Sequence, residues 1–428
     1  MRWRSSRSPV DREGQTIEPI LPVYALLPFV AMLAAIAVLP LSAPAWWESN
    51  RNKFVVSCGL GLPILAVYLR RQPFALVTMG EEYVSFILLL ASLYVISGGI
   101  LLRGDLEATP LTNTAFLAAG SVLASFVGTT GASMLLIRPL LQTNRERARV
   151  KHTVIFFIFL VCNIGGMLTP LGDPPLFLGY LQGVPFTWTF RLWLPWLLMV
   201  ATLLLVYFIW DSLEHARESL AALRRDRTQV EPLRVLGAVN GLWLAGVVLA
   251  VALLRAPWRE AVMVGLGALS LWTTPSRVRR ANGFTAHPII EVAVLFFGIF
   301  LTMIPALELL QARAPAFGIR QPWQFFWATG LLSSVLDNAP TYLTFFALAR
   351  GLGLTDEVAG LSHGVLTGIS LGAVAMGANT YIGNAPNFMV KSIAEKAGVK
   401  MPSFFGYVVY SGSLLIPLFV GITFIFFR

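Results

Sequence analysis

Long apolar runs, each close to the length of a membrane helix, alternate with short polar segments along the whole chain. The runs cover residues 21–40, 54–69, 83–102, 113–141, 153–183, 190–210, 236–254, 258–274, 289–308, 322–350, 358–397 and 403–427. About 20 apolar residues in a helix span the hydrocarbon core of a bilayer. The pattern therefore predicts an all-α polytopic membrane protein with about 10 transmembrane helices.

Two of the runs are too long for one helix and are interrupted in the middle. Residues 113–141 break at Gly128-Thr129-Thr130-Gly131, and residues 322–350 break at Asp337-Asn338-Ala339-Pro340. We expect each to be a re-entrant hairpin of two half-helices that meet at a polar tip.

Two other runs break later, at residues 169–175 and 379–386, which are rich in proline and glycine. Backbone groups freed at such breaks find no partner in lipid, so they face protein or water. We expect the two hairpin tips and these two breaks to meet in one polar cavity near the middle of the bilayer.

The two halves of the chain carry the same series of elements. Residues 169–178 read Thr-Pro-Leu-Gly-Asp-Pro-Pro-Leu-Phe-Leu, and residues 380–389 read Thr-Tyr-Ile-Gly-Asn-Ala-Pro-Asn-Phe-Met. The hairpin tips, and helices predicted to open at Glu82 and Glu291, recur in the same order. An odd number of crossings per half gives the second copy the opposite polarity, as in inverted-repeat secondary transporters.

The repeat predicts the domain organisation. We expect an N-terminal tail at 1–20, a first transmembrane repeat at 21–210, a cytoplasmic linker at 211–235 and a second, inverted repeat at 236–428. The first run follows Arg2, Arg4 and Arg7 and precedes Leu-Ser-Ala-Pro-Ala, which also fits a signal peptide. Its length and its place in the repeat favour a retained helix.

Composition and charge agree with a membrane protein. Of 428 residues, 56% are hydrophobic and only 13% charged, and the mean hydropathy is +0.70, which excludes a soluble enzyme and a disordered chain. More than half of the 32 lysines and arginines lie in loops that the repeat assigns to one side. The positive-inside rule makes that side cytoplasmic, with both termini outside, although the basic N-terminal tail argues the other way.

The net charge of +10 is explained by basic loops facing anionic lipid, so no nucleic-acid partner is expected. We expect a multi-pass protein of the cell (inner) membrane. Cys58 and Cys162 both lie inside apolar runs and form neither a disulfide framework nor a metal cluster.

Two carboxylates, Asp173 and Asp337, lie at breaks inside apolar runs, where polar residues are costly and usually functional. Neutral oxygen-bearing side chains surround them, and hard cations such as sodium prefer oxygen ligands. These candidates are Thr129, Thr130, Asn163, Thr169, Asn338, Thr341, Asn379, Thr380 and Asn384. The alternative is that the aspartates only cap the half-helices that follow them.

Two other features of the sequence are weaker indications of function. Arg138 lies inside the second arm of the first hairpin, where it binds an anionic substrate, balances an aspartate or extends to the membrane surface. Residues 360–364 match G-x-S-x-G, but glycine continues at 368 and 372, which indicates a small-residue packing stripe. We therefore do not expect an enzyme, and no organic cofactor is implied; sodium and protons are the expected coupling ions.

The predicted arrangement, in which each of two inverted halves has a hairpin followed by a broken helix, resembles that of the ion transporter superfamily. It includes sodium/proton antiporters, arsenite permeases, citrate–metal transporters and divalent-anion/sodium symporters. Residues 169–186 and 336–343 are similar to its antiporter-like, citrate-transport branch. In the symporters, a Ser-Asn-Thr triplet at each tip holds sodium and the substrate carboxylate.

The corresponding tips here read Gly128-Thr129-Thr130 and Asp337-Asn338-Ala339. The first lacks the asparagine and the second adds a negative charge, which favours cations. The resemblance thus implies a secondary antiporter that exchanges sodium, or a similar monovalent cation, for protons by alternating access. The alternative is a transporter of citrate, another di- or tricarboxylate, or arsenite, coupled to cations. The implied partners are small ions or a small carboxylate, the lipid bilayer and, as is usual in the superfamily, a second copy of the chain.

Overall fold

The computed structural model describes residues 21–353 and 357–428, so the expected tail at 1–20 lies outside the described residues. Within this part of the chain, seven helical stretches are long and apolar enough to cross a membrane. They are Val23–Pro40, Asn50–Arg71, Pro73–Ser97, Pro110–Val127, Phe186–His215, His287–Phe317 and Phe404–Phe426. Shorter apolar helical stretches lie at Lys151–Met167 and Val239–Leu253. The chain is an all-α polytopic membrane protein, as the apolar pattern predicts.

The first half begins with three long helices, then a hairpin, an interrupted helix and a long helix. Its elements are α1 (Leu27–Ser42), α2 (Pro44–Trp47), α3 (Asn50–Arg71), α4 (Pro73–Ser97), β1 (Leu101–Asp105), α5 (Pro110–Val127), α6 (Thr129–Thr143), α7 (Lys151–Leu160), α8 (Pro174–Leu181) and α9 (Trp193–His215). The segment between the halves contains α10 (Leu220–Thr228) and β2 (Glu231–Leu236).

The second half repeats this order. Its elements are α11 (Val239–Leu253), α12 (Trp258–Thr273), α13 (Ser276–Ala281), α14 (His287–Arg313), α15 (Pro322–Ser333), α16 (Asn338–Gly351), α17 (His363–Met376), α18 (Ala385–Lys396) and α19 (Phe404–Phe426). Helices α8 and α18 begin 211 residues apart, at Pro174 and Ala385, and α9 and α19 begin at the same interval.

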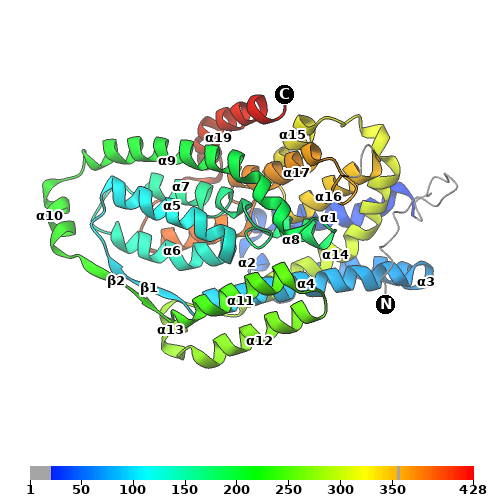
Figure 1. Cartoon of the computed structure of the whole chain (residues 1–428), viewed down its shortest axis with the longest axis horizontal. Helices are drawn as coiled ribbons and strands as arrows, with labels where there is room; N and C mark the ends of the chain where they lie inside the picture. The colour runs from blue at the N-terminus through cyan, green and yellow to red at the C-terminus, as the bar shows by residue number, and fades with distance from the viewer. Residues whose placement is uncertain (1–20, 354–356) are drawn as a thin grey trace.

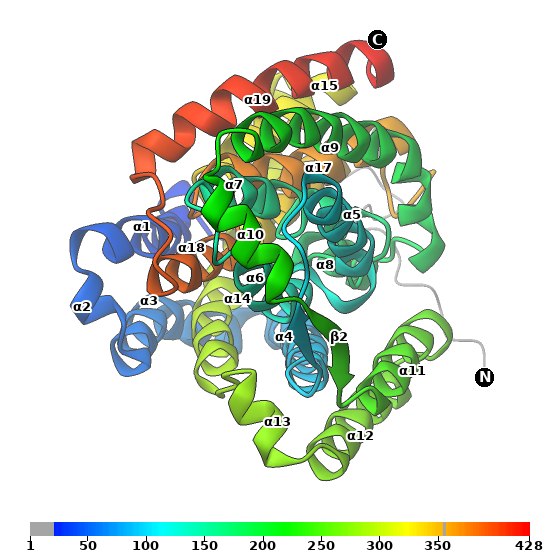
Figure 2. The same cartoon turned by 90° about the vertical axis from the view of Figure 1, so that its left-hand side faces the viewer.

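The two hairpins enter from opposite ends of the molecule (Figure 1). Helix α5 begins and helix α6 ends near the end that carries β1, β2, α10 and α13, whereas α15 begins and α16 ends toward the other end. Figure 2 looks onto the first of these ends, with α10 in front. Entry from opposite ends is what an inverted repeat requires.

Both interrupted helices have the same local structure. The main chain at Gly172 passes so close to Gly166 that an added Cβ would lie 2.1 Å from the Gly166 carbonyl oxygen. In the second half, a Cβ on Gly383 would lie 2.6 Å from the carbonyl oxygen of Gly377. Since no side chain fits at such distances, glycine at these positions is what allows the chain to fold back on itself at each break.

Some predicted boundaries were wrong. Helix α4 begins at Pro73 and α14 at His287, so Glu82 and Glu291 do not open their helices. The carboxylate of Glu291 instead pairs with Lys53 of α3 at 2.6 Å, and Glu82 accepts a hydrogen bond from Gln182 at 2.9 Å. These contacts join neighbouring helices, an arrangement that spacing along one helix does not reveal.

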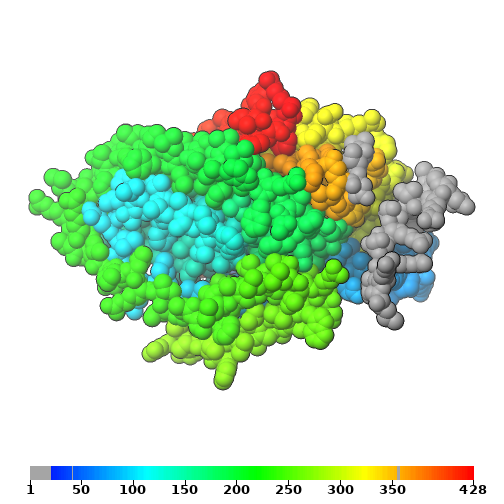
Figure 3. Space-filling view, in the orientation of Figure 1, coloured from blue at the N-terminus to red at the C-terminus, as the bar shows by residue number. Residues whose placement is uncertain are grey.

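Residues 101–105 and 231–236 form a two-stranded antiparallel ribbon that the apolar pattern did not predict. The expected helix at 83–102 ends at Ser97, and the expected linker at 211–235 contains both α10 and β2. In Figure 3 the side chains of this linker, in green, lie at the left end beside the first hairpin, in cyan.

The G-x-S-x-G match has a structural explanation. Ser362 caps α17 by accepting a hydrogen bond from the Val365 amide at 3.3 Å. A Cβ on Gly368 or Gly372 would lie 2.4 Å from a main-chain oxygen of α15. These glycines therefore let α15 and α17 approach closely, as the small-residue stripe predicts.

Candidate functional site

The carboxylate of Asp173 joins four interrupted elements. Asp173 is 1% exposed and precedes α8. Its Oδ1 accepts hydrogen bonds from the Thr129 hydroxyl at 2.8 Å and the Asn384 amide at 3.1 Å, and its Oδ2 accepts one from the Asn338 amide at 2.6 Å. Thr129 begins α6, Asn338 begins α16 and Asn384 precedes α18. Both hairpin tips and both breaks therefore meet at one side chain, which confirms that part of the expectation.

Prolines explain why this carboxylate is free to make these bonds. A capping side chain bonds the amide of the second or third residue of its helix, and Pro175 at the second position of α8 has no amide hydrogen. The amide of Leu176, at the third position, donates to the carbonyl oxygen of Asp173 at 3.1 Å. Asp173 accordingly makes no capping bond. Asn384 is likewise followed, two residues later, by Pro386 and makes no capping bond. The capping alternative does not hold for Asp173, and the proline spacing was the sequence signal against it.

Asp337 behaves differently. Its Oδ1 accepts a hydrogen bond from the Ala339 amide at 3.1 Å and so caps α16. The side chain of Thr341 donates to the Asp337 carbonyl oxygen at 2.9 Å. Asp337 is half-buried, and none of its described hydrogen bonds reaches Asp173. The structure therefore separates the two aspartates that the sequence treated alike.

The environment of Asp173 is polar, and no basic side chain in the described part of the chain pairs with it. No ion pair among the described residues involves this carboxylate. Four helices, α6, α8, α16 and α18, begin beside it. The N-terminal end of a helix carries partial positive charge, so these four ends favour negative charge at the site. Helix dipoles and amide groups thus stabilise the buried carboxylate, but no cationic side chain among the described residues neutralises it.

Three amide oxygens near the breaks are buried and have no hydrogen-bond partner among the described residues. They are the Oδ1 atoms of Asn338, Asn163 and Asn379. Asn338 contacts Asp173 directly through its other amide atom. Asn163 donates to Asn387 at 2.7 Å, and Asn379 donates to the Ser334 hydroxyl at 2.9 Å. Unpaired buried oxygens of this kind suit a bound cation.

Equivalent hydrogen bonds hold the two breaks against the hairpins. The Thr169 hydroxyl donates to the Ser125 carbonyl oxygen, and the Thr380 hydroxyl donates to the Ser334 carbonyl oxygen at 2.5 Å. The sequence analysis named both threonines but missed both serines. Ser125 and Ser334 lie 209 residues apart, close to the repeat interval, which was the signal that identifies them. Thr130, the remaining candidate, is half-buried at the first tip.

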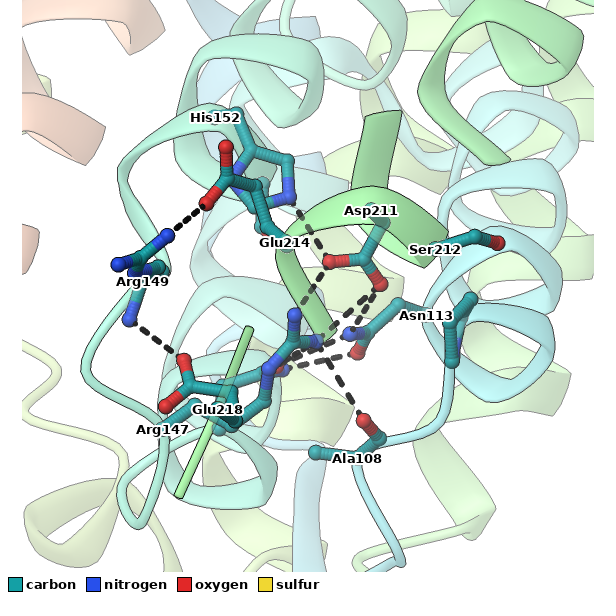
Figure 4. Close-up of polar contacts among 12 residues, drawn as sticks. Ala108, Asn113, Arg147, Arg149, His152, Asp211, Ser212, Glu214 and Glu218 are labelled. Atoms are coloured by element: carbon teal, nitrogen blue, oxygen red, sulfur yellow. Dashed lines mark hydrogen bonds and ion pairs between the residues drawn. The ribbon is translucent and has the colours of Figure 1, made fainter. Parts of the chain in front are cut away.

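A second buried polar cluster lies at the base of the first hairpin (Figure 4). Asp211 of α9 accepts hydrogen bonds from both terminal nitrogens of Arg147, at 2.7 and 3.1 Å, and lies 2.8 Å from Nε2 of His152. Asn113 of α5 donates to the same carboxylate at 3.2 Å. Because Asn113 also bonds to Asn144 beyond α6, the cluster ties both arms of the hairpin to α9.

Arg138 does not face the Asp173 site. One of its terminal nitrogens donates to the carbonyl oxygen of Asn282 at 2.5 Å, just beyond α13. The guanidinium therefore joins the first hairpin to the second half of the chain. None of the roles considered from the sequence describes this contact.

One comparison with known proteins finds a relationship. A family described as "Putative citrate transport" matches residues 18–427, nearly the whole chain. A comparison with curated proteins finds no match.

Proposed function

The chain belongs to the "Putative citrate transport" family, and from this premise we propose that it is a secondary transporter that exchanges sodium, or a similar monovalent cation, for protons. The observation that carries the proposal is the buried carboxylate of Asp173, which joins both hairpins and has no basic partner among the described residues. We place it as a multi-pass protein of the cell (inner) membrane, with the 211–235 linker in the cytoplasm.

A carboxylate in this position needs a positive charge. Burying an ionised group without a partner is costly, so Asp173 is neutralised either by a proton or by a bound cation. The two ligands compete for the same oxygens, since a proton on the carboxyl group removes the charge that holds the cation. Competition at one group, combined with access from alternate sides, produces exchange of one ion for the other.

The neighbouring residues supply further ligands in this proposal. Asp173, the Thr129 hydroxyl and the free Oδ1 of Asn338 provide oxygens from three elements. Asn163, Asn379 and Asn384 extend the polar surroundings from the two breaks. Thr169, Thr341 and Thr380 hold the main chain of the breaks and the second tip, because their hydroxyls donate to carbonyl oxygens. Thr130, beside Thr129, completes the first tip.

The structure changes the expected role of Asp337. Since its carboxylate caps α16, we propose that it attracts cations toward the site and that the exchange itself depends on Asp173. Asparagine caps a helix about as well as aspartate. Asp337→Asn is therefore a matched control for Asp173→Asn, because each removes one negative charge at a break.

Cation-coupled transport of citrate is the second candidate. It is favoured by the description of the family and by the four helix N-termini beside the site, which suit carboxylate groups. In this scheme Asp173 still binds the coupling cation, and the substrate carboxylates occupy the helix ends. Without a cation, a multiply charged anion is repelled by Asp173.

Transport into proteoliposomes distinguishes the two functions. An inward sodium gradient is applied to vesicles that contain a pH-sensitive dye, and labelled citrate uptake is measured in parallel. Exchange predicts sodium-driven proton efflux in the wild type and in Asp337→Asn, and none in Asp173→Asn. Sodium-dependent citrate uptake without proton movement would instead establish the second candidate.

A further inference from the structure

The two-stranded ribbon carries an unusual pair of like charges. Strands β1 and β2 are antiparallel, with Leu101 opposite Leu236 and Arg103 opposite Arg234. Side chains two residues apart on a strand point to the same face. One face of the ribbon therefore presents two leucines followed by two arginines.

Neither arginine is neutralised by the protein. Arg103 and Arg234 are exposed, and no hydrogen bond or ion pair of their side chains occurs among the described residues. Directly opposed like charges destabilise a strand pair. The Cβ atoms of directly opposed residues lie about 5 Å apart, so the two guanidinium groups can bind the oxygens of the same phosphate group. Arginine binds phosphate in a bidentate manner. The ribbon is thus built to receive an anion.

The ribbon is held at the ends of membrane helices. β1 follows α4 and β2 precedes α11. The Asn282 amide donates to the carbonyl oxygens of Gly98 and Ile100 at 3.2 and 2.9 Å, and the Asn240 amide donates to that of Gly99 at 3.1 Å. The base of the ribbon is therefore fixed, with the leucine pair nearer the helix ends than the arginine pair.

Charged side chains near the ribbon indicate that the anion site lies at the pair of Arg103 and Arg234. Helix α13 packs against β1, and its Arg277 and Arg280 are exposed. The acidic residues lie one step farther out, where Asp105 is opposite Glu231. Within the ribbon, the arginine pair therefore lies nearer α4 and α11, and the acidic pair lies at the end where Arg145 contacts Asp105 at 3.5 Å.

We propose that the ribbon binds the phosphate group of an anionic phospholipid, with Arg103 and Arg234 holding the phosphate and Leu101 and Leu236 contacting the acyl chain. An exposed apolar residue on the same face as Arg234 supports a lipid over a free anion, because Leu236 is 41% exposed. The proposal does not depend on which substrate the protein transports.

The test uses the full chain in nanodiscs of phosphatidylcholine alone or mixed with phosphatidylglycerol. Hydrogen exchange of residues 101–105 and 231–236 and the retention of phosphatidylglycerol in native mass spectrometry are measured. The variant is Arg103→Gln/Arg234→Gln. The matched control is Arg224→Gln/Arg225→Gln, which removes two exposed charges from α10 at the same end.

Phosphatidylglycerol is expected to protect the ribbon of the wild type and of the control. The ribbon variant should bind this lipid about thirtyfold more weakly, the effect of two basic residues at an anionic surface. Arg234→Gln alone, which removes the like-charge opposition, should fold and lose part of the effect. Equal losses in ribbon and control variants would overturn the proposal, and so would full protection by inorganic phosphate in phosphatidylcholine nanodiscs.

Discussion

Removing Asp211 should destabilise the protein more than removing Arg147, although the two form one ion pair. Both side chains are almost fully buried, with exposures of 0% and 1%. Asp211→Leu leaves the guanidinium of Arg147 buried without its carboxylate. Breaking a buried pair in this way costs about 3–5 kcal/mol of the free energy of unfolding.

Arg147→Met leaves the carboxylate of Asp211 with other partners. The carboxylate of Asp211 keeps the His152 contact at 2.8 Å and the Asn113 hydrogen bond at 3.2 Å. Since the carboxylate keeps these two hydrogen-bond partners, we expect a smaller cost of about 1–3 kcal/mol. The double variant removes both charges, so its cost should be less than the sum of the single costs by about 2 kcal/mol.

The assay is unfolding of the purified protein by SDS in mixed micelles, followed by circular dichroism. The more exposed pair of Arg149, which is 48% exposed, and Glu214, near the end of α9, lies at 3.0 Å and provides the control. Its removal should cost less than about 1 kcal/mol. The reasoning is refuted if the two single costs are simply additive, or if Asp211→Leu costs no more than the exposed control.

Three further predictions follow from local contacts. Gly172→Ala should abolish transport while circular dichroism keeps its helical signal, because the new Cβ would lie 2.1 Å from a carbonyl oxygen; Gly241→Ala, with nothing within 4 Å, should have no effect. Ser362→Ala should lower the free energy of unfolding by about 1 kcal/mol in the same SDS titration, since it removes the cap of α17. Burial, followed by the nearby Glu146, Glu107 and Asp105, raises the pKa of Asp226. Stability should therefore fall as the pH rises from about 4 through the raised pKa, and Asp226→Asn should melt at a higher temperature than the wild type at pH 7 but not at pH 3.

The apolar pattern was sufficient to predict the order of the elements because lipid imposes a simple rule on it. Each run must be helical, and each break must be buried. The breaks at residues 169–175 and 379–386 were therefore visible from glycine and proline alone. The same reasoning predicted that the tips and breaks meet, but not that Thr129, Asn338 and Asn384 all bond to Asp173.

Features that depend on contacts between distant segments could not be predicted from the sequence. The ribbon pairs Arg103 with Arg234, and two short segments without polar alternation give no strand signal. Arg147 lies in the loop between α6 and α7, and its partner Asp211 is 64 residues away on α9, so the pair could not be predicted from spacing. The difference between Asp173 and Asp337 was only partly visible, because it depends on which amide hydrogens the following prolines remove.

The central claim is that a proton and a cation compete for Asp173. It is tested most directly by adding sodium chloride to the purified protein in weakly buffered detergent solution and recording the pH. Choline chloride serves as the salt control, and Asp337→Asn as the protein control. Competition predicts that sodium releases protons from the wild type and from Asp337→Asn, and releases none from Asp173→Asn. Equal proton release from Asp173→Asn, or no release from the wild type at any pH between 5 and 9, would contradict the account.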